Sequence, residues 1–172
     1  MTQYKYHLFQ SSVGWIALLG SEKGLRRLSM KPEPQEALSD LGAELDRSAN
    51  DPDEFSAVQQ SLERYLQGDG DALNDITLDL FDAPPFFGAA WEACRRIPAG
   101  ETRSYSWLAA EAGSPRAVRA AGQAMARNRF ALIIPCHRVI ASDGDLRGYG
   151  AGGLRVKAKL LQLELARKDG AK

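Results

Sequence analysis

The stretch SYSWLAAEAGSPRAVRAAGQAMARN, residues 104–128, predicts two short helices joined by a tight turn. Gly113 is expected to end the first helix. Ser114 then has the side chain of a good N-cap, and Pro115 stands at the favoured first position of the second helix. Two short helices around a glycine-containing turn are the outline of a helix-turn-helix, a motif that can place its second helix against DNA.

The second helix of this pair is expected to have one basic face. On a helical wheel of residues 116–127, small and apolar side chains, among them Ala117 and Val118, gather on the core side. The opposite side carries Arg116, Arg119, Gln123 and Arg127. Gly122 and Ala126 flank this basic face with almost no bulk, so the helix can approach a phosphate-lined groove closely. A merely solvated helix face is the alternative interpretation.

Charge is divided unevenly along the chain, although the formal net charge is zero. Residues 1–94 hold 7 lysines and arginines against 16 aspartates and glutamates, a net charge of −9. Residues 95–172 hold 15 against 6, a net charge of +9. Such a division is typical of an acidic portion joined to a portion that binds nucleic acid. Chance surface charge is the alternative.

The length of 172 residues fits one ordinary domain or two small ones closely packed, and the pattern of strands and helices predicts an α+β fold. Apolar and alternating runs predict strands over 4–8, 14–20, 25–30 and 76–81, and helical spacing predicts helices over 37–45 and 55–66. Asp82-Ala83-Pro84-Pro85 interrupts this pattern, so we place a domain boundary after residue 83. Residues 84–172 are predicted to be mostly helical, with a helix over 85–97 that turns Trp91 toward the core.

The run LIIPCHRVI, residues 132–140, places a cysteine, a histidine and an arginine between aliphatic residues. A free thiol has a pKa of about 8.5. Burial raises that pKa, so Cys136 needs an activating group in order to react. His137 is the adjacent base, but in an ideal strand the two side chains would point to opposite faces. Pro135 has no N–H to give to a sheet, which makes a turn the alternative to a strand.

A further polar group is expected in the last helix, over residues 154–168. Glu164 falls within the apolar arc of this helix, and an acid between leucines is usually paired. Its partner is either Lys157 or an arginine, or it is His137, which would complete a nucleophile–base–acid arrangement. Cys94 lies in the middle of a predicted amphipathic helix and is expected to be inert.

Several other kinds of site lack support in the sequence. The two cysteines and two histidines do not have the spacing of zinc ligands or of a disulfide framework. The glycine-rich loop 148–153 lacks the Walker and Rossmann patterns, which argues against a nucleotide cofactor. Neither a signal peptide nor an apolar run of about 18 residues is present, so no membrane contact is expected. We expect a protein of the cytoplasm, or of the nucleus in a eukaryote.

Four segments together resemble one known family. They are GETRSY (100–105), RAVRAAGQAMARN (116–128), PCHRVI (135–140) and GYGAGGLRVKAKLLQLE (148–164). In these segments the chain is similar to the O6-alkylguanine-DNA alkyltransferases, the methylated-DNA–protein-cysteine methyltransferases. The resemblance implies a ribonuclease-H-like α/β domain over residues 1–83, which match in general layout, and a winged helix-turn-helix domain over residues 84–172.

The resemblance also implies an activity. An alkyl group such as methyl would pass from O6 of guanine in double-stranded DNA to Cys136, directly and irreversibly, after the base is flipped out through the minor groove. Such a reaction needs no metal and no cofactor. His137 would act as base through a water, and Glu164 would orient it. Asn128 would tie the recognition helix to the active-site segment, and Tyr105 would donate a proton toward the purine. Repair at O4 of thymine is left open.

Contacts with DNA and with the base follow from the same resemblance. Arg119 would insert into the duplex in place of the extruded base, and Arg138 would brace the site. The other implied DNA contacts are Tyr105, Ser106, Ser114, Gly122 and Ser142. The implied pocket residues are Val139, Tyr149, Gly150 and Ala151. The loop after Tyr149 is one residue longer than the commonest family pattern, so the amide that donates to O6 is either Gly150 or Ala151.

Three other functions fit parts of the sequence. A relative that binds alkylated DNA without repairing it typically lacks the cysteine, so Cys136 argues against that function. A redox-sensing transcriptional regulator would need a reading helix rich in Asn or Gln. A cysteine hydrolase would need an oxyanion hole and a distant histidine. The sequence gives no reason to expect an oligomer and leaves cooperative binding along DNA open.

Overall fold

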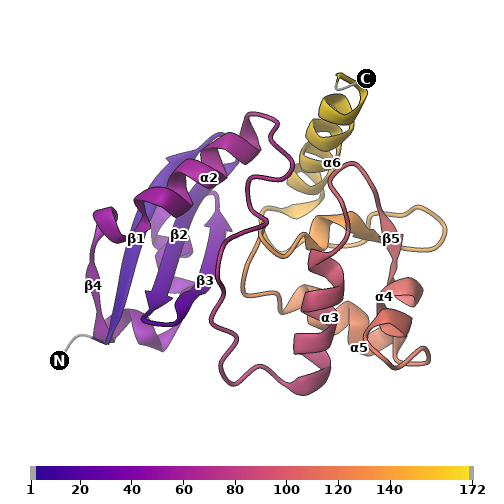
Figure 1. The fold of residues 1–172 in the computed structure, drawn as a ribbon, viewed down its shortest axis with the longest axis horizontal. Coiled ribbons are helices and arrows are strands. Elements are labelled where there is room, and N and C mark those ends of the chain that lie inside the picture. Colours follow the sequence, from indigo (N-terminus) through magenta and orange to yellow (C-terminus); the bar gives the residue numbers. More distant parts are fainter. Residues whose placement is uncertain (1–2, 171–172) are drawn as a thin grey trace. The chain divides into compact units, whose positions relative to one another are not determined.

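The structure, a computed structural model, describes residues 3–170, and of residues 167–170 it describes the backbone alone. These residues group into two compact units (Figure 1). The first unit comprises the chain up to Leu80 together with Arg129–Ala131, and the second comprises Phe81–Asn128 and the chain from Leu132 onward. The sequence did not indicate that residues 129–131 return to the first unit. The domain limit after residue 83 stays a prediction.

The first unit is built on a four-stranded sheet with the strand order β3-β2-β1-β4. β1 (Tyr4–Ser11), β2 (Gly14–Ser21) and β3 (Gly24–Lys31) form an antiparallel meander, which confirms the three predicted strands. β4 (Ser48–Asn50) pairs in parallel with β1 and was not predicted, because its three residues carry no hydrophobic alternation. Residues 16–19 of β2 are fully buried, so this strand is the centre of the core.

Two helices pack with this sheet, and one of them is shorter than predicted. α1 (Pro34–Ser39) stops early: the predicted helix over 37–45 is wrong, since Gly42 adopts a φ of +86° and Ala43–Arg47 forms a separate 3-10 turn. A 3-10 turn at Pro52–Phe55 leads into α2 (Ser56–Leu66), which confirms the second helix and lies along the sheet in Figure 1. The core residues Tyr4, Ala17, Leu19, Ala37 and Leu41 form one cluster.

The predicted strand over 76–81 is not formed. Leu78 makes only an isolated parallel bridge to Leu25, with a 2.9 Å hydrogen bond from the Leu25 N–H to the Thr77 carbonyl. The polar Asp79 is the buried residue of this segment. Its carboxylate accepts hydrogen bonds from Ser21 Oγ at 2.6 Å and from Arg26 at 3.1 Å. The alternation of the sequence therefore does not reflect burial here.

The second unit is mostly helical. Its elements are α3 (Pro85–Arg95), β5 (Arg103–Ser104), α4 (Tyr105–Glu111), α5 (Val118–Ala126), a 3-10 turn (Cys136–Arg138), β6 (Val139–Ile140) and α6 (Gly153–Gly170). β5 and β6 pair in parallel, and α3, α4 and α5 pack on one another. Trp91 of α3 is buried, as predicted, and its Nε1 donates to the Ala124 carbonyl of α5 at 2.8 Å. This bond holds α5 against α3.

The helix-turn-helix is formed by α4 and α5, but its turn is longer than the sequence indicated. Gly113 adopts a φ of +95° just beyond α4, as its expected role requires. The residues from Ser114 to Ala117 form a turn, closed by a 2.9 Å bond from the Ala117 N–H to the Ser114 carbonyl. α5 begins only at Val118. The prediction of Ser114 as N-cap and Pro115 as first helical residue is therefore wrong.

None of the helices within residues 3–170 is long and apolar enough to cross a membrane. The mixed sheet of the first unit and the helices of the second confirm the α+β class.

Trp91→Phe tests the link between α3 and α5. We expect the free energy of unfolding to fall by about 1–2 kcal/mol, because one buried hydrogen bond is lost and the smaller ring leaves a void. Urea denaturation measures the change. Trp107→Phe is the control, since the Trp107 ring is only half-buried and lies beside the Arg103 guanidinium. An equal loss in both variants would contradict a specific role for the Trp91 hydrogen bond.

Candidate active site

Cys136 lies on a turn, which decides between the two alternatives left by the sequence. Pro135, with φ −79° and ψ 66°, breaks the extended run, and Cys136–Arg138 form a single 3-10 turn. The Cys136 N–H donates to the Ile134 carbonyl at 2.7 Å, and the Arg138 N–H donates to the Pro135 carbonyl at 2.8 Å. The strand begins only at Val139. Cys136 and His137 are therefore not forced to opposite faces of a strand.

Asn128 connects the end of α5 to this turn. Its Nδ2 donates to Cys136 Sγ at 3.2 Å and to the Ile134 carbonyl at 2.8 Å. Asn128 follows Arg127, the C-cap residue of α5. One amide group thus fixes the position of the thiol relative to the second helix of the helix-turn-helix.

Burial raises the pKa of the Cys136 thiol above its ordinary value. The hydrogen bond from Asn128 and the positive charge of Lys157 lower the pKa part of the way back. The thiol is therefore neutral in the resting protein, and a base must take its proton when it reacts. Cys94 is buried in α3, and burial raises its pKa further still, in keeping with an inert thiol.

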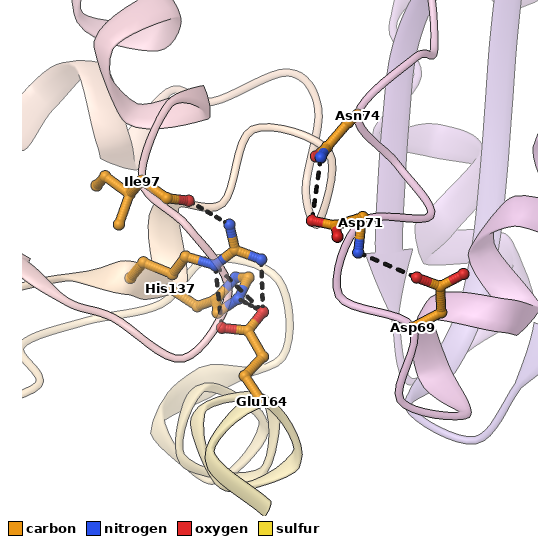
Figure 2. A network of polar contacts seen from close by, with 7 residues as sticks. Asp69, Asp71, Asn74, Ile97, His137 and Glu164 are labelled. Atoms are coloured by element: carbon orange, nitrogen blue, oxygen red, sulfur yellow. Dashed lines mark hydrogen bonds and ion pairs between the residues drawn. The ribbon is translucent and has the colours of Figure 1, made fainter. Parts of the chain in front are cut away.

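Glu164 contacts both the histidine and an arginine that were considered as its partners. Lys157, the third candidate, is not one of its partners. Glu164 Oε2 lies 2.9 Å from His137 Nε2 and 2.8 Å from Arg138 Nη2, and Arg138 Nε lies 3.0 Å from Oε1 (Figure 2). Arg138 also donates through Nη1 to the Ile97 carbonyl at 2.5 Å. All three side chains are buried. A fork-shaped guanidinium suits such a paired contact with a carboxylate.

The charges of this cluster follow from its contacts. Burial alone would raise the pKa of Glu164, but the hydrogen bonds from His137 and Arg138 outweigh it and lower that pKa to about 2. Burial lowers the pKa of His137, and Glu164 offsets only part of this effect. Glu164 is thus ionised and His137 neutral at pH 7. With Nε2–H donated to the carboxylate, the imidazole carries its basic lone pair on Nδ1.

A pocket of about 880 Å³ opens beside the thiol. Its lining brings together eight of the predicted site residues, namely Tyr105, Ser106, Arg119, Gly122, Cys136, Ser142, Tyr149 and Gly150. The other six predicted site residues are not among the lining residues: Ser114, Asn128, His137, Val139, Ala151 and Glu164. Tyr149 lies edge-on to His137, with ring centroids 6.4 Å apart, so it connects the pocket wall to His137.

Some lining residues were not predicted. They are Val118, Met125, Ala126, Ala141, Asp143, Arg147 and Gly148. Val118 was expected on the core face of the helix, but it is 36% exposed and borders the pocket, because α5 starts only at this residue. Arg147 adopts a φ of +58°, a conformation that no feature of its sequence neighbourhood indicates.

A metal ion has no evident place in this arrangement. Within residues 3–170, no three histidine, cysteine, aspartate or glutamate side chains gather in a way that could hold one.

Comparison with known proteins identifies the family. The model of the 6-O-methylguanine DNA methyltransferase ribonuclease-like domain matches residues 4–80, and the model of the DNA binding domain of the same proteins matches residues 85–166. The chain belongs to the 6-O-methylguanine DNA methyltransferase family. The family's two-domain architecture agrees with the α+β fold described above.

Relatives in this methyltransferase family match over nearly their whole length. The methylated-DNA–protein-cysteine methyltransferase of Methanosarcina acetivorans is 38% identical over 161 residues, which cover 92% of this chain and 97% of the relative. The protein of that name from Mycobacterium tuberculosis is 38% identical over 162 residues, covering 94% and 93%. The crystal structure of Mycobacterium tuberculosis OGT in complex with DNA has a TM-score of 0.79 and 36% identity, and covers 95% of this chain and 94% of that one.

The His137–Glu164 pair predicts how the stability of this methyltransferase family member depends on pH. The ordinary pKa of a glutamate is 4.5 and that of a histidine is 6.5, and the pKa values of both Glu164 and His137 are lower in the folded chain. The unfolded chain therefore binds more protons below these values, so stability is full above pH 6.5 and falls on acidification. The Glu164 part is lost as the pH drops from 4.5 toward 2.

Urea denaturation over a pH series measures this dependence, with Glu164→Gln as the matched variant. At neutral pH the variant should lose about 3–5 kcal/mol, because Arg138 is left buried without a counter-charge. Below pH 4.5 its stability should fall less steeply than that of the wild type. Parallel curves for the two proteins would contradict the depressed pKa of Glu164.

Proposed function

We propose that this chain repairs alkylated DNA by transferring an alkyl group, such as methyl, from O6 of guanine to Sγ of Cys136. One observation carries the proposal: the thiol borders a pocket and stands beside a buried, neutral His137 that is paired with Glu164. The names of the relatives and the complex of one of them with DNA support it. The protein is a methylated-DNA–protein-cysteine methyltransferase.

Double-stranded DNA that contains O6-alkylguanine is the partner, approached from the minor groove. O6 of a stacked guanine faces the major groove, so a protein in the minor groove reaches it only by flipping the base out. The pocket walls come from α4, from α5 and from the loop 141–150, so a flipped base enters directly beside the helix-turn-helix. Arg119 takes the place of the extruded base, and Ser106, Ser114, Gly122 and Ser142 contact the DNA.

The transfer is an in-line displacement at the alkyl carbon. A bond from Cys136 Sγ to this carbon forms as the carbon–O6 bond breaks. The thiol proton passes through a water to His137, which Glu164 holds in the basic tautomer. The departing guanine takes a proton from Tyr105, whose pKa burial raises, so that the hydroxyl is protonated at neutral pH. Asn128 keeps Sγ in place during the displacement.

The product is a thioether, which is a poor leaving group, so the transfer is irreversible and each chain acts once. The step as written uses no metal and no cofactor. Gly150 is the proposed amide donor to O6, since it lines the pocket and Ala151 does not. Tyr149 lines the pocket and supports the base, and Val139, which directly follows the 3-10 turn, supports the thiol turn. O4 of thymine is an additional candidate substrate.

The remaining proposals concern the whole chain. We place the domain limits at 1–83 and 84–172, close to the extents of the two matching family models. Action in the cytoplasm is proposed, since the relatives named above come from an archaeon and a bacterium. A monomer is proposed because the sequence gives no reason to expect an oligomer.

The decisive experiment is the intact mass of the protein after mixing with a duplex that contains O6-methylguanine, followed by peptide mapping. We expect one methyl group per chain, on Cys136. Cys136→Ser should gain no mass yet still bind the alkylated duplex, because the helix-turn-helix is untouched. Cys94→Ser is the control and should react like the wild type. Methyl uptake by the Cys136→Ser variant would refute the role of this thiol.

Arg119→Ala separates DNA handling from chemistry. Arg119 is exposed on α5 and borders the mouth of the pocket, so its loss should slow methyl transfer from duplex DNA by about tenfold or more. Reaction with free O6-benzylguanine, which needs no extrusion from a duplex, should change far less. Arg64→Ala, an exposed arginine of α2, is the control. Equal losses with both substrates would contradict the insertion of Arg119 into the duplex.

A further inference from the structure

Lys157 is a charged side chain in the interior of the second unit. It extends from α6, is 1% exposed and belongs to the largest fully buried side chains of the structure. A buried ammonium group requires hydrogen-bond acceptors around it. Lys157 Nζ donates to the Val139 carbonyl at 2.9 Å and to the Leu146 carbonyl, and it lies 3.5 Å from the Gly148 carbonyl. All of these acceptors are backbone groups, so the ammonium holds main chain in place.

The three carbonyls bracket one loop. Val139 follows the turn that carries Cys136, and Leu146 and Gly148 lie at the far end of the loop 141–148, which follows β6. Within the loop the backbone bonds are local, such as Ala141 N–H to the Asp145 carbonyl at 2.8 Å. Lys157 therefore ties the two ends of the loop to each other and to α6.

This loop forms a large part of the pocket wall. It supplies Ala141, Ser142, Asp143, Arg147 and Gly148 to the lining, and Tyr149 and Gly150 follow directly. A loop with only local hydrogen bonds of its own needs an external contact to keep one shape. Any shift of this wall would change how far a bound base lies from Sγ, and small displacements of this kind lower reaction rates strongly.

We propose that Lys157 is a positioning residue that fixes the loop 141–148 as the wall of the alkylguanine pocket. The inference deepens the proposed function and rests on it. Lys157 acts through the loop and does not itself touch the base. Its charge also lies near enough to favour the thiolate of Cys136, so the test has to separate positioning of the loop from activation of the thiol.

The test compares two electrophiles in Lys157→Met. Free O6-benzylguanine has to be held by the pocket, whereas iodoacetamide is small and needs no pocket wall. We expect the rate of Cys136 alkylation by O6-benzylguanine to fall by about 10- to 100-fold, with a higher half-saturating concentration. For alkylation by iodoacetamide, the loss of rate should be at least about tenfold smaller than the loss with O6-benzylguanine. Equal losses with both reagents would overturn the proposal in favour of a purely electrostatic role.

Lys159→Met is the matched control, because it removes the same charge from an exposed position on the same helix. It should react like the wild type with both reagents. Lys157→Arg keeps the charge and the donors, and it should recover part of the reaction with O6-benzylguanine. A folded Lys157→Arg variant that reacts with O6-benzylguanine no faster than Lys157→Met would also contradict the proposal.

Hydrogen exchange tests the loop without any transfer reaction. In Lys157→Met, or in Lys157→Gln where the methionine variant does not fold, amides of residues 141–148 should exchange faster while those of α5 stay unchanged. Unchanged exchange in the loop would overturn the proposal. A wild-type protein that fails to take up methyl from O6-methylguanine would refute the proposed function, and the exchange result would still stand on its own.

Discussion

The rest of the site depends on the contacts that the carboxylate of Glu164 makes with its neighbours. Two successive residues, His137 and Arg138, reach the same carboxylate, which the two opposite faces of a strand would not allow. The 3-10 turn that begins at Cys136 makes this convergence possible. Arg138 extends the contact to the carbonyl of Ile97, just beyond α3. One buried cluster of charged side chains therefore holds the turn that carries the thiol, sets the tautomer of His137 and fixes α6 against that turn.

Two further side chains hold the reacting turn from other directions. Asn128 reaches it from the end of α5, and Lys157 reaches the strand behind it from α6. Each uses backbone carbonyls as acceptors, which are available whatever the side chains of the loop are. Besides the side-chain contacts of Glu164, these two residues thus hold the turn through its main chain, which helps a turn with little regular structure to keep a stable geometry.

Much of the fold could be predicted from hydrophobic pattern and helix punctuation, and the failures have physical causes. The meander and α2 followed their periodicity. Residues 76–81 alternate like a strand, but a hydrogen-bonded Asp79 is the residue that goes inside. The turn before Val118 could not be predicted, because Ser114 has the side chain of a good N-cap and so indicates an earlier helix start. In the structure its carbonyl instead accepts the hydrogen bond that closes a turn.

The same contrast holds for the site. Cys136, His137 and Glu164 could be proposed from the sequence because cysteine, histidine and a glutamate between leucines are chemically conspicuous, and the structure places His137 and Glu164 in contact. Lys157 was considered only as a partner of Glu164, since contacts between a side chain and distant carbonyls leave no trace in residue types. Arg147 and Asp143 line the pocket because of the shape of their loop, which the conformational propensities of single residues do not determine.

The return of residues 129–131 to the first unit limits how modular this protein can be. The Leu28 N–H of β3 donates to the Arg129 carbonyl at 2.7 Å, and the buried Phe130 bridges to Leu28. These residues stand between Asn128 and the reacting cysteine in the chain. A fragment cut at residue 81 would keep every residue proposed to contact the alkyl group but lose β3, with which this segment is paired. The segment that leads from α5 to the reacting cysteine therefore depends on β3 of the acidic half for its backbone pairing.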